Sequence, residues 1–516
     1  MTTSFRTEHD LLGNRQVPAE AYWGIHTLRA LENFPISGKP IGSYPHLIRA
    51  LALVKLAAAR ANRELGELDP ATHDAIVAAC GEIAAGRLHD QFAVDVIQGG
   101  AGTSTNMNAN EVIANLALEK LGWPKGHYEA VHPINHVNMS QSTNDVYPTA
   151  VKLALVFLLV NLQEAMGALK QAFADKAAEF REILKIGRTQ LQDAVPMTLG
   201  QEFSTYAVMI DEDIARLREA TALVREVNLG ATAIGTGINT DERYAGLAVR
   251  FLSEAAGVDL IPALNLVEAT QDTGSFVQLS GVLKRIACKL SKICNDLRLL
   301  SSGPQAGFGE INLPERAAGS SIMPGKVNPI IPEVVNQIAF EVIGNDMTIT
   351  MASEGGQLQL NAFEPIIAHS LFKSIEHLAA GCRTLALNCV RGITANRALP
   401  GGAGAHLGRA RHGVNPHIDG YEKRHLDRPR GLRSGAVSEL VLEKGWMTAE
   451  GELNAVLRPE SLHPPRAPRR PRRAQARQIT PTGTAGAAHP LPPIPRSGAA
   501  NPRPVSMLSD RPAAAG

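Results

Sequence analysis

The stretch TAVKLALVFLLVNLQEAMGALKQAFADKAAEF, residues 149–180, decides the fold. It contains no proline, and Gly167 is its single glycine. Its apolar residues, among them Leu153, Val156 and Val160, recur at the spacing of an α-helix. At 1.5 Å per residue the stretch predicts a rod of about 45–50 Å.

Further apolar-rich stretches with charges on one face follow at 198–227, 274–300, 332–351 and 357–390. No alternating strand pattern competes with them. Their apolar stripes are wider than one partner helix can cover. We therefore predict a mainly α fold with a central long-helix bundle that continues across a subunit interface, which makes the chain a homo-oligomer.

The central bundle domain is predicted to be residues 141–396, with three further parts around it. Residues 1–140 form an N-terminal domain of mixed short helices. Residues 397–457 form an atypical small domain. The tail 458–516 holds ten arginines, no lysine, two acidic residues and 13 of the 32 prolines, a composition typical of disorder.

Composition excludes several classes of protein. The chain is nearly neutral, with 51 basic and 50 acidic residues, and 44% of its residues are hydrophobic. Five cysteines without a CxxC motif argue against a disulfide framework or zinc module and favour the cytoplasm. The N-terminus lacks a signal-peptide core, and the apolar run 153–162 is shorter than the ~20 residues that cross a bilayer.

The arginine-rich tail offers one alternative function, since arginines bind nucleic acid by counterion release. The tail has no interleaved aromatic residues and no adjoining recognition fold. We therefore interpret it as a solvated extension and keep nucleic-acid binding only as an alternative.

Four polar clusters are placed by the sequence at loops that run into helices. Helix starts favour anions, and these clusters supply hydroxyl and amide donors with one lysine, Lys326, which suits a small dicarboxylate. A single cluster would be read as a helix cap, but four together favour a site. The clusters are GGAGTSTNMNANE (99–111), SQSTNDVYPT (140–149), GRTQLQDAVPMTLGQE (187–202) and GSSIMPGKVNP (319–329).

No segment matches the known motifs for binding nucleotides or zinc. GSSIMPGKV has Val327 where a P-loop needs Ser or Thr, and no glycine-rich segment matches the dinucleotide fingerprint. His132 and His136 flank Pro133 without an HExxH pattern, which favours hydrogen-bonding histidines over zinc ligands. Cys382 and Cys389 are predicted to be buried thiols. We assign no metal site.

GSSIMPGKVNP resembles the signature of the fumarase/aspartase superfamily, and the other three clusters match further site segments of that superfamily in order and approximate spacing. The likeness covers roughly residues 8–396. Three details favour the aspartase branch over the fumarase branch. They are Gln190 where fumarases have histidine, Thr143 where they usually have a second serine, and the segment GGQLQLNAFEP (355–365).

The resemblance implies a helical three-domain fold that forms a homotetramer, with each active site drawing segments from three subunits. It implies reversible anti-elimination of ammonia from L-aspartate to give fumarate, with no organic cofactor. Activation by Mg²⁺, which occurs in some relatives, stays open. A class II fumarase is the alternative enzyme, and a non-catalytic oligomeric scaffold is the alternative outside catalysis.

The resemblance also implies roles for individual residues. Removing the C3 proton of aspartate makes the β-carboxylate a dianion, which preorganised donors must stabilise. Ser320 is the implied general base, and Glu333 would tune the loop around it. Arg29 would be either a distal carboxylate contact or a structural residue. The β-carboxylate would be held by Thr103, Ser142, Thr143 and the Ser320–Ser321 loop, the α-carboxylate by Lys326, Asn328 and Thr189, and the ammonium group by Asn144 and Gln190.

After Asn396 the resemblance breaks. The glycines and the proline of the next segment, RALPGGAGAHLGRARHG (397–413), disfavour a helix. Sequence that resembles the family returns at 415–423 and 437–460. Alternation of this kind is what compensating reading-frame slips in the gene would produce. Resequencing that finds the same codons in frame would reject this hypothesis. The four site clusters lie upstream of the break.

Overall fold

The computed structural model describes residues 4–303, 306–319 and 326–396. These residues all belong to one compact unit, Met1–His463. Ser320, Ser321, the predicted small domain 397–457 and the tail 458–516 lie outside the described residues. The domain boundaries and the frame-slip hypothesis therefore stay predictions.

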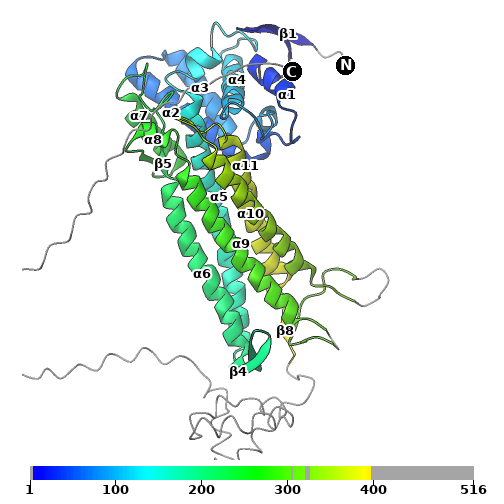
Figure 1. The fold of residues 1–516 in the computed structure, drawn as a ribbon. Helices are drawn as coiled ribbons and strands as arrows, with labels where there is room; N and C mark the ends of the chain where they lie inside the picture. The colour runs from blue at the N-terminus through cyan, green and yellow to red at the C-terminus, as the bar shows by residue number, and fades with distance from the viewer. Residues whose placement is uncertain (1–3, 304–305, 320–325, 397–516) are drawn as a thin grey trace, which may run out of the picture. The chain divides into compact units, whose positions relative to one another are not determined.

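Five long helices lie side by side and form the bundle (Figure 1). Successive helices of the bundle run in opposite directions, and apolar side chains from all five meet in one core. The mainly α fold predicted from the sequence is confirmed. The helices are α5 (Thr143–Glu179), α6 (Leu199–Leu223), α9 (Gly274–Leu300), α10 (Ile330–Glu354) and α11 (Glu364–Asn388).

Helix α5 starts earlier than its apolar pattern indicates, because it runs through a proline. Pro148 has no N–H, so the carbonyl of Asn144 lacks its helical donor. The side chain of Asn228 donates to that carbonyl at 3.0 Å instead. Ser142 and Asp145 close a capping box at the helix start. Together these side chains let the helix begin at Thr143 rather than at Thr149.

Helix α5 is also long and apolar enough to cross a membrane by length and composition. In the structure, however, 83% of its most apolar window is buried against the rest of the chain. It packs along α6 and α11 at the centre of the bundle. It is a core helix of the fold.

The N-terminal part differs from the predicted set of short helices. It opens with a β-hairpin, and α2 and α4 have 21 and 18 residues, so the prediction of short helices was wrong for these two. The alanine- and leucine-rich sequence of α2 contains no glycine and sustains a long helix. The elements are β1 (Phe5–Asp10), β2 (Gly13–Pro18), α1 (Ile25–Asn33), α2 (Pro45–Leu65), α3 (Pro70–Ala84) and α4 (Thr103–Lys120).

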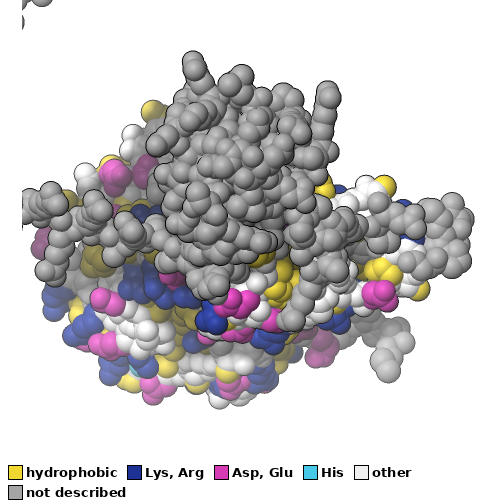
Figure 2. Space-filling model, turned by 90° about the horizontal axis from the view of Figure 1, so that it is seen from below, with side chains coloured by type: hydrophobic (Ala, Val, Ile, Leu, Met, Phe, Trp, Pro, Cys, Tyr) yellow, Lys and Arg dark blue, Asp and Glu magenta, His cyan; other side chains and the backbone are white. Residues whose placement is uncertain are grey.

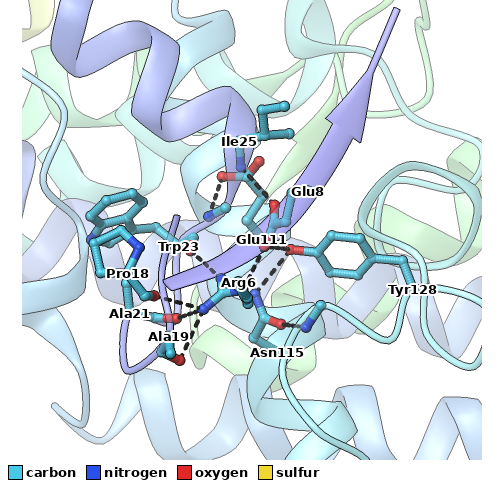
Figure 3. A network of polar contacts seen from close by, with 12 residues as sticks. Arg6, Glu8, Pro18, Ala19, Ala21, Trp23, Ile25, Glu111, Asn115 and Tyr128 are labelled. Carbon is cyan, nitrogen blue, oxygen red and sulfur yellow. Dashed lines mark hydrogen bonds and ion pairs between the residues drawn. The ribbon is translucent and has the colours of Figure 1, made fainter. Parts of the chain in front are cut away.

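A buried ionic network fastens the N-terminal hairpin to α4 (Figure 3). Arg6 pairs with Glu8, which also accepts from Tyr128 and from the backbone N–H of Ile25. Glu111 of α4 accepts from three backbone N–H groups at the start of α1. Burial raises the pKa of Glu111 to about 7. These contacts fix α1, and with it Arg29, against α4.

The remaining elements are short and connect the helices. All the sheets among the described residues have two strands. The pair β5–β6 is parallel, and the other pairs are antiparallel. These elements are the 3₁₀ turns η1 (Ile41–Ser43), η2 (His89–Gln91) and η4 (Val390–Gly392), the π-turn η3 (Pro133–Val137), α7 (Tyr244–Ala256), α8 (Leu266–Ala269), β3 (Leu184–Thr189), β4 (Gln192–Thr198), β5 (Glu226–Val227), β6 (Ile261–Pro262), β7 (Ile311–Asn312) and β8 (Thr394–Ala395).

Candidate active site

The first two polar clusters meet where α4 and α5 begin. Gly102 precedes α4 with φ 90°, and a Cβ there would lie 2.5 Å from the ring of Tyr147 on α5. Only glycine allows the two helix starts to approach this closely. Thr103 is exposed, and Ser142 and Thr143 are half-buried. The structure therefore brings these three predicted hydroxyls to one end of the bundle.

The start of α5 is held by hydrogen bonds that leave specific atoms facing outward. Asp145 accepts from the backbone N–H of Ser142 at 2.9 Å and from those of Gly230 and Thr232. Burial raises the pKa of Asp145 to about 6. Asn144 donates through Nδ2 to the carbonyl of Ala233 at 2.7 Å. This bond leaves the side-chain Oδ1 of Asn144 as the atom that can accept from an ammonium group.

The third cluster leads into α6 as predicted, but its first part is a β-hairpin rather than a loop. It forms the antiparallel hairpin of β3 and β4, with Thr189 paired to Gln192 and a two-residue turn between them. Gln190 and Leu191 have φ of 54° and 61°, the signature of a type I′ turn. Thr189 and Gln190 are exposed at the tip of this hairpin.

The turn gives a prediction about stability. Left-handed backbone at a branched side chain is unfavourable, and type I′ turns favour Gly at the second position. We expect Leu191→Gly to stabilise the protein by about 0.5–1 kcal/mol, after subtracting the entropy cost of glycine. Urea unfolding measures the change. A lower unfolding midpoint would show that the Leu191 side chain makes stabilising contacts, for example with another subunit.

A charged network ties the hairpin to the segment that leads to the fourth cluster. Glu310 pairs with Lys185 at 2.8 Å and with Arg188 at 2.5 Å, and Lys185 also pairs with Glu202. The guanidinium of Arg188 lies over the ring of Phe308. Seen from the hairpin end, the described surface carries basic and acidic side chains side by side (Figure 2). The hairpin is therefore anchored next to the segment that precedes residues 319–329.

The fourth cluster leads into α10, as predicted. Ser320 and Ser321 lie outside the described residues. Lys326 and Asn328 are exposed immediately before α10, and Glu333 is half-buried in its first turn. Among the described residues, none forms an ion pair with Lys326.

Two other predictions concern Arg29 and the histidines. Arg29 binds the carboxylate of Asp10 through two nitrogens at 2.6 and 2.7 Å, and this bond lowers the pKa of Asp10 to about 2. The contact supports the structural interpretation of Arg29. His132 accepts from two backbone N–H groups and His136 from one, so both are hydrogen-bonding histidines as predicted. Cys382 and Cys389 are buried free thiols.

Within one chain the predicted site residues form two separate groups. Thr103, Ser142, Thr143 and Asn144 lie where α5 begins, whereas the hairpin that follows α5 carries Thr189 and Gln190. The 37 residues of α5 separate the two groups by about 55 Å. Lys326 and Asn328 precede α10, which begins at the hairpin end of the bundle (Figure 1). One chain alone does not bring the two groups together.

A buried polar group behind the start of α5 was not predicted from the sequence. Lys55 of α2 is fully buried and donates to Asn138 at 2.8 Å. Burial lowers the pKa of Lys55 to about 7. Asn106 of α4 donates to both Asn138 and Thr143. A lysine on the apolar side of an alanine-rich helix is the sequence signal that could have revealed this group.

The comparisons identify the class of protein. The family model described as Lyase matches residues 13–344. Aspartate ammonia-lyases from Pseudomonas fluorescens and Escherichia coli (strain K12) are 58% and 51% identical, each over 90% of this chain and 97% of the relative. The chain therefore belongs to the Lyase family, as the resemblance to the fumarase/aspartase superfamily predicted.

Solved structures agree with this assignment. The structure titled fumarate lyase:delta crystallin from Brucella melitensis bound to cobalt has a TM-score of 0.85 and 54% identity, covering 89% of this chain and 100% of that one. A class II fumarase from Schistosoma mansoni has a TM-score of 0.83 and 32% identity, covering 89% and 99%. An alignment over nine tenths of this chain extends past residue 396, so related sequence continues beyond the described residues.

Proposed function

We propose that this chain catalyses the reversible deamination of L-aspartate to fumarate and ammonia, in an active site assembled from several copies of the chain. Aspartate ammonia-lyases more than 50% identical over 90% of the chain support the reaction. The observation that carries the site is the pair of complementary groups at the two ends of α5. One supplies hydroxyl donors at helix starts, and the other supplies Lys326 with amide and hydroxyl donors.

The residue types suit the charges of the substrate. Thr103, Ser142 and Thr143 would donate to the β-carboxylate, on which the second negative charge develops. Lys326, Asn328 and Thr189 would hold the α-carboxylate. The freed Oδ1 of Asn144 supports its role as an acceptor for the ammonium group, and Gln190 would join it there.

The proposed elimination starts with Ser320 as the general base. Its deprotonated hydroxyl takes the C3 proton, and the electron pair moves into the β-carboxylate to give the aci-carboxylate. That pair then forms the C2–C3 double bond as the C2–N bond breaks and ammonia leaves on the opposite face. This chemistry uses no organic cofactor, and activation by Mg²⁺ stays a prediction.

An exposed apolar stripe on α10 supports assembly of the site from several copies. Phe340, Met347 and Met351 are 62%, 60% and 68% exposed, and Val334 and Ile343 extend the stripe. Large apolar side chains in such a row mark a surface that another chain covers. We propose that second copies cover it in a homotetramer, which would bring the hairpin end of one chain to the α4–α5 end of another. We expect this enzyme in the cytoplasm.

Class II fumarase remains the second candidate, favoured by the Schistosoma mansoni structure. The two enzymes are distinguished by supplying either L-aspartate or L-malate as the sole substrate and monitoring fumarate through its ultraviolet absorbance. We expect turnover of aspartate, and a malate rate no higher than that of a Ser320→Ala control. Turnover of malate alone would make the protein a fumarase. A tetramer without either activity would favour the scaffold interpretation.

Nucleic-acid binding through the tail is a separate alternative. Truncation at Arg458 leaves the described residues intact. Retention of nucleic acid by the full chain, lost on truncation, would support this alternative.

A further inference from the structure

A chain of hydrogen bonds runs from a buried lysine to a hydroxyl at the proposed site. Nζ of Lys55 donates to Oδ1 of Asn138 at 2.8 Å. Nδ2 of Asn106 donates to the same Oδ1 and to Oγ1 of Thr143, each at 3.1 Å. Nδ2 of Asn110 also donates to Oδ1 of Asn138, at 3.1 Å. Lys55, Asn106 and Asn110 are all buried, whereas Asn138 and Thr143 are half-buried.

The chemistry of the four groups fixes the direction of every bond. The Asn138 nitrogen donates to the carbonyl of Gln141 at 3.1 Å, and a carbonyl can only accept. The oxygen of the Asn138 amide therefore faces Lys55, which donates to it at 2.8 Å. Asn106 can approach the Asn138 oxygen only with its NH₂ group. The same NH₂ group also donates to Oγ1 of Thr143.

The consequence falls on the Thr143 hydroxyl. Because its oxygen accepts from Asn106, its proton cannot point toward Asn106. Among the described residues, none accepts a hydrogen bond from this hydroxyl. Thr143 is half-buried at the first position of α5. Its proton is therefore left to donate outward, to whatever binds there.

We propose that Lys55, Asn138 and Asn106 are positioning residues that orient the Thr143 hydroxyl to donate to the β-carboxylate of the substrate. The inference rests on the proposed function, which places that carboxylate at the start of α5. A preset donor needs no reorientation when charge develops on the carboxylate. By accepting from Asn106, the Thr143 hydroxyl is also polarised, which makes it a stronger donor.

Two isosteric changes test the direction of the bonds. In Asn106→Asp a carboxylate can only accept, so it would take the Thr143 proton and turn the hydroxyl inward. In Asn138→Asp the acceptor for Lys55 and Asn106 remains, so the direction is kept. At pH 8.5, where carboxyl groups are ionised, we expect Asn106→Asp to lower kcat/KM for aspartate by about 100-fold or more. We expect Asn138→Asp to stay within tenfold of the parent and Asn138→Leu to fall with Asn106→Asp.

Matched controls separate direction from stability. Asn108 is equally buried on α4 but donates to the carbonyl of Gln91, away from this chain of bonds. Asn108→Asp should lower the thermal midpoint and leave kcat/KM within threefold. In a Thr143→Ala background, Asn106→Asp should add less than threefold to the loss. Native mass and thermal midpoint confirm that each variant is folded and assembled.

Parent-like kcat/KM in Asn106→Asp would overturn the inference, and so would an equal loss in Asn138→Asp and Asn138→Leu. A full additional loss from Asn106→Asp in the Thr143→Ala background would also do so. If the parent does not deaminate aspartate, the proposed function fails by itself. Calorimetric binding of succinate, which carries both carboxylates, then still ranks the variants and decides the direction of the hydroxyl. Parent-like succinate binding by Asn106→Asp would overturn the inference there too.

Discussion

Co-expressing a Ser142→Ala chain with a Lys326→Met chain is expected to restore fumarate formation that neither chain supports alone. Each change removes a donor to a substrate carboxylate, which should cost about 10²–10³-fold in rate. The two residues lie at opposite ends of the bundle, so each site would take them from different chains. In randomly mixed assemblies about a quarter of the sites would receive both intact segments.

Two tags on the two chains allow mixed assemblies to be purified and their rate of aspartate deamination measured. The matched control pairs Ser142→Ala with Thr143→Ala. Both residues lie at the same helix start, so no mixed site is intact, and we expect no recovery. If the Ser142→Ala and Lys326→Met assemblies form but stay inactive, sites built from different chains are wrong. Thermal midpoints check that loss of the Ser142 cap, worth about 1 kcal/mol, leaves the chains folded.

A charge on the apolar stripe of α10 should abolish both assembly and activity. In Met347→Glu the new carboxylate would be buried without a partner wherever a second copy covers this helix, and such burial costs several kcal/mol per interface. We expect the native mass to fall below four chains and aspartate deamination to drop more than 100-fold. Light scattering and the rate assay on the same sample measure both.

The control uses an apolar residue exposed elsewhere. Leu264 lies in a loop and is fully exposed, and Leu264→Glu should change neither mass nor rate. A monomeric Met347→Glu protein with full activity would show that one chain holds a complete site. A tetrameric Met347→Glu protein would show that α10 is not the assembly surface.

The helices could be predicted because their apolar periodicity is long and uninterrupted. Residues 274–300 were predicted to the residue, and α10 and α11 were each placed with their ends displaced by two to seven residues. The start of α5 was missed because Pro148 reads as a break. The side chain that satisfies the freed carbonyl of Asn144, Asn228, is 84 residues further along the chain. Such a partner is visible only in the folded structure.

The strands were missed for a different reason. β1 and β2 are polar, and along β1 only Glu8 is buried, held by Arg6 and Tyr128. No alternation of apolar residues marks them. The turn at Gln190 and Leu191 contains no Gly, Asn or Pro, so it carries no turn signal. Long-range contacts, rather than local preferences, define both hairpins.

The candidate site was predictable as a set of residues but not as an arrangement. Clusters of hydroxyl and amide residues can be recognised in the sequence. The distance between them along α5 depends on how the helices run in the folded structure, which the sequence does not show. Lys55 shows the limit most clearly. Its role depends on its burial and on the orientation of Asn138, and neither is visible along the chain.

The length of α5 has a genetic consequence. If its two ends serve different reaction centres, every polypeptide takes part in more than one of them. A defective copy altered at both ends would then spoil sites that its healthy neighbours help to build. Output would fall roughly with the square of the healthy fraction, so a half-and-half mixture would keep about a quarter of full turnover. Such an allele would be dominant-negative.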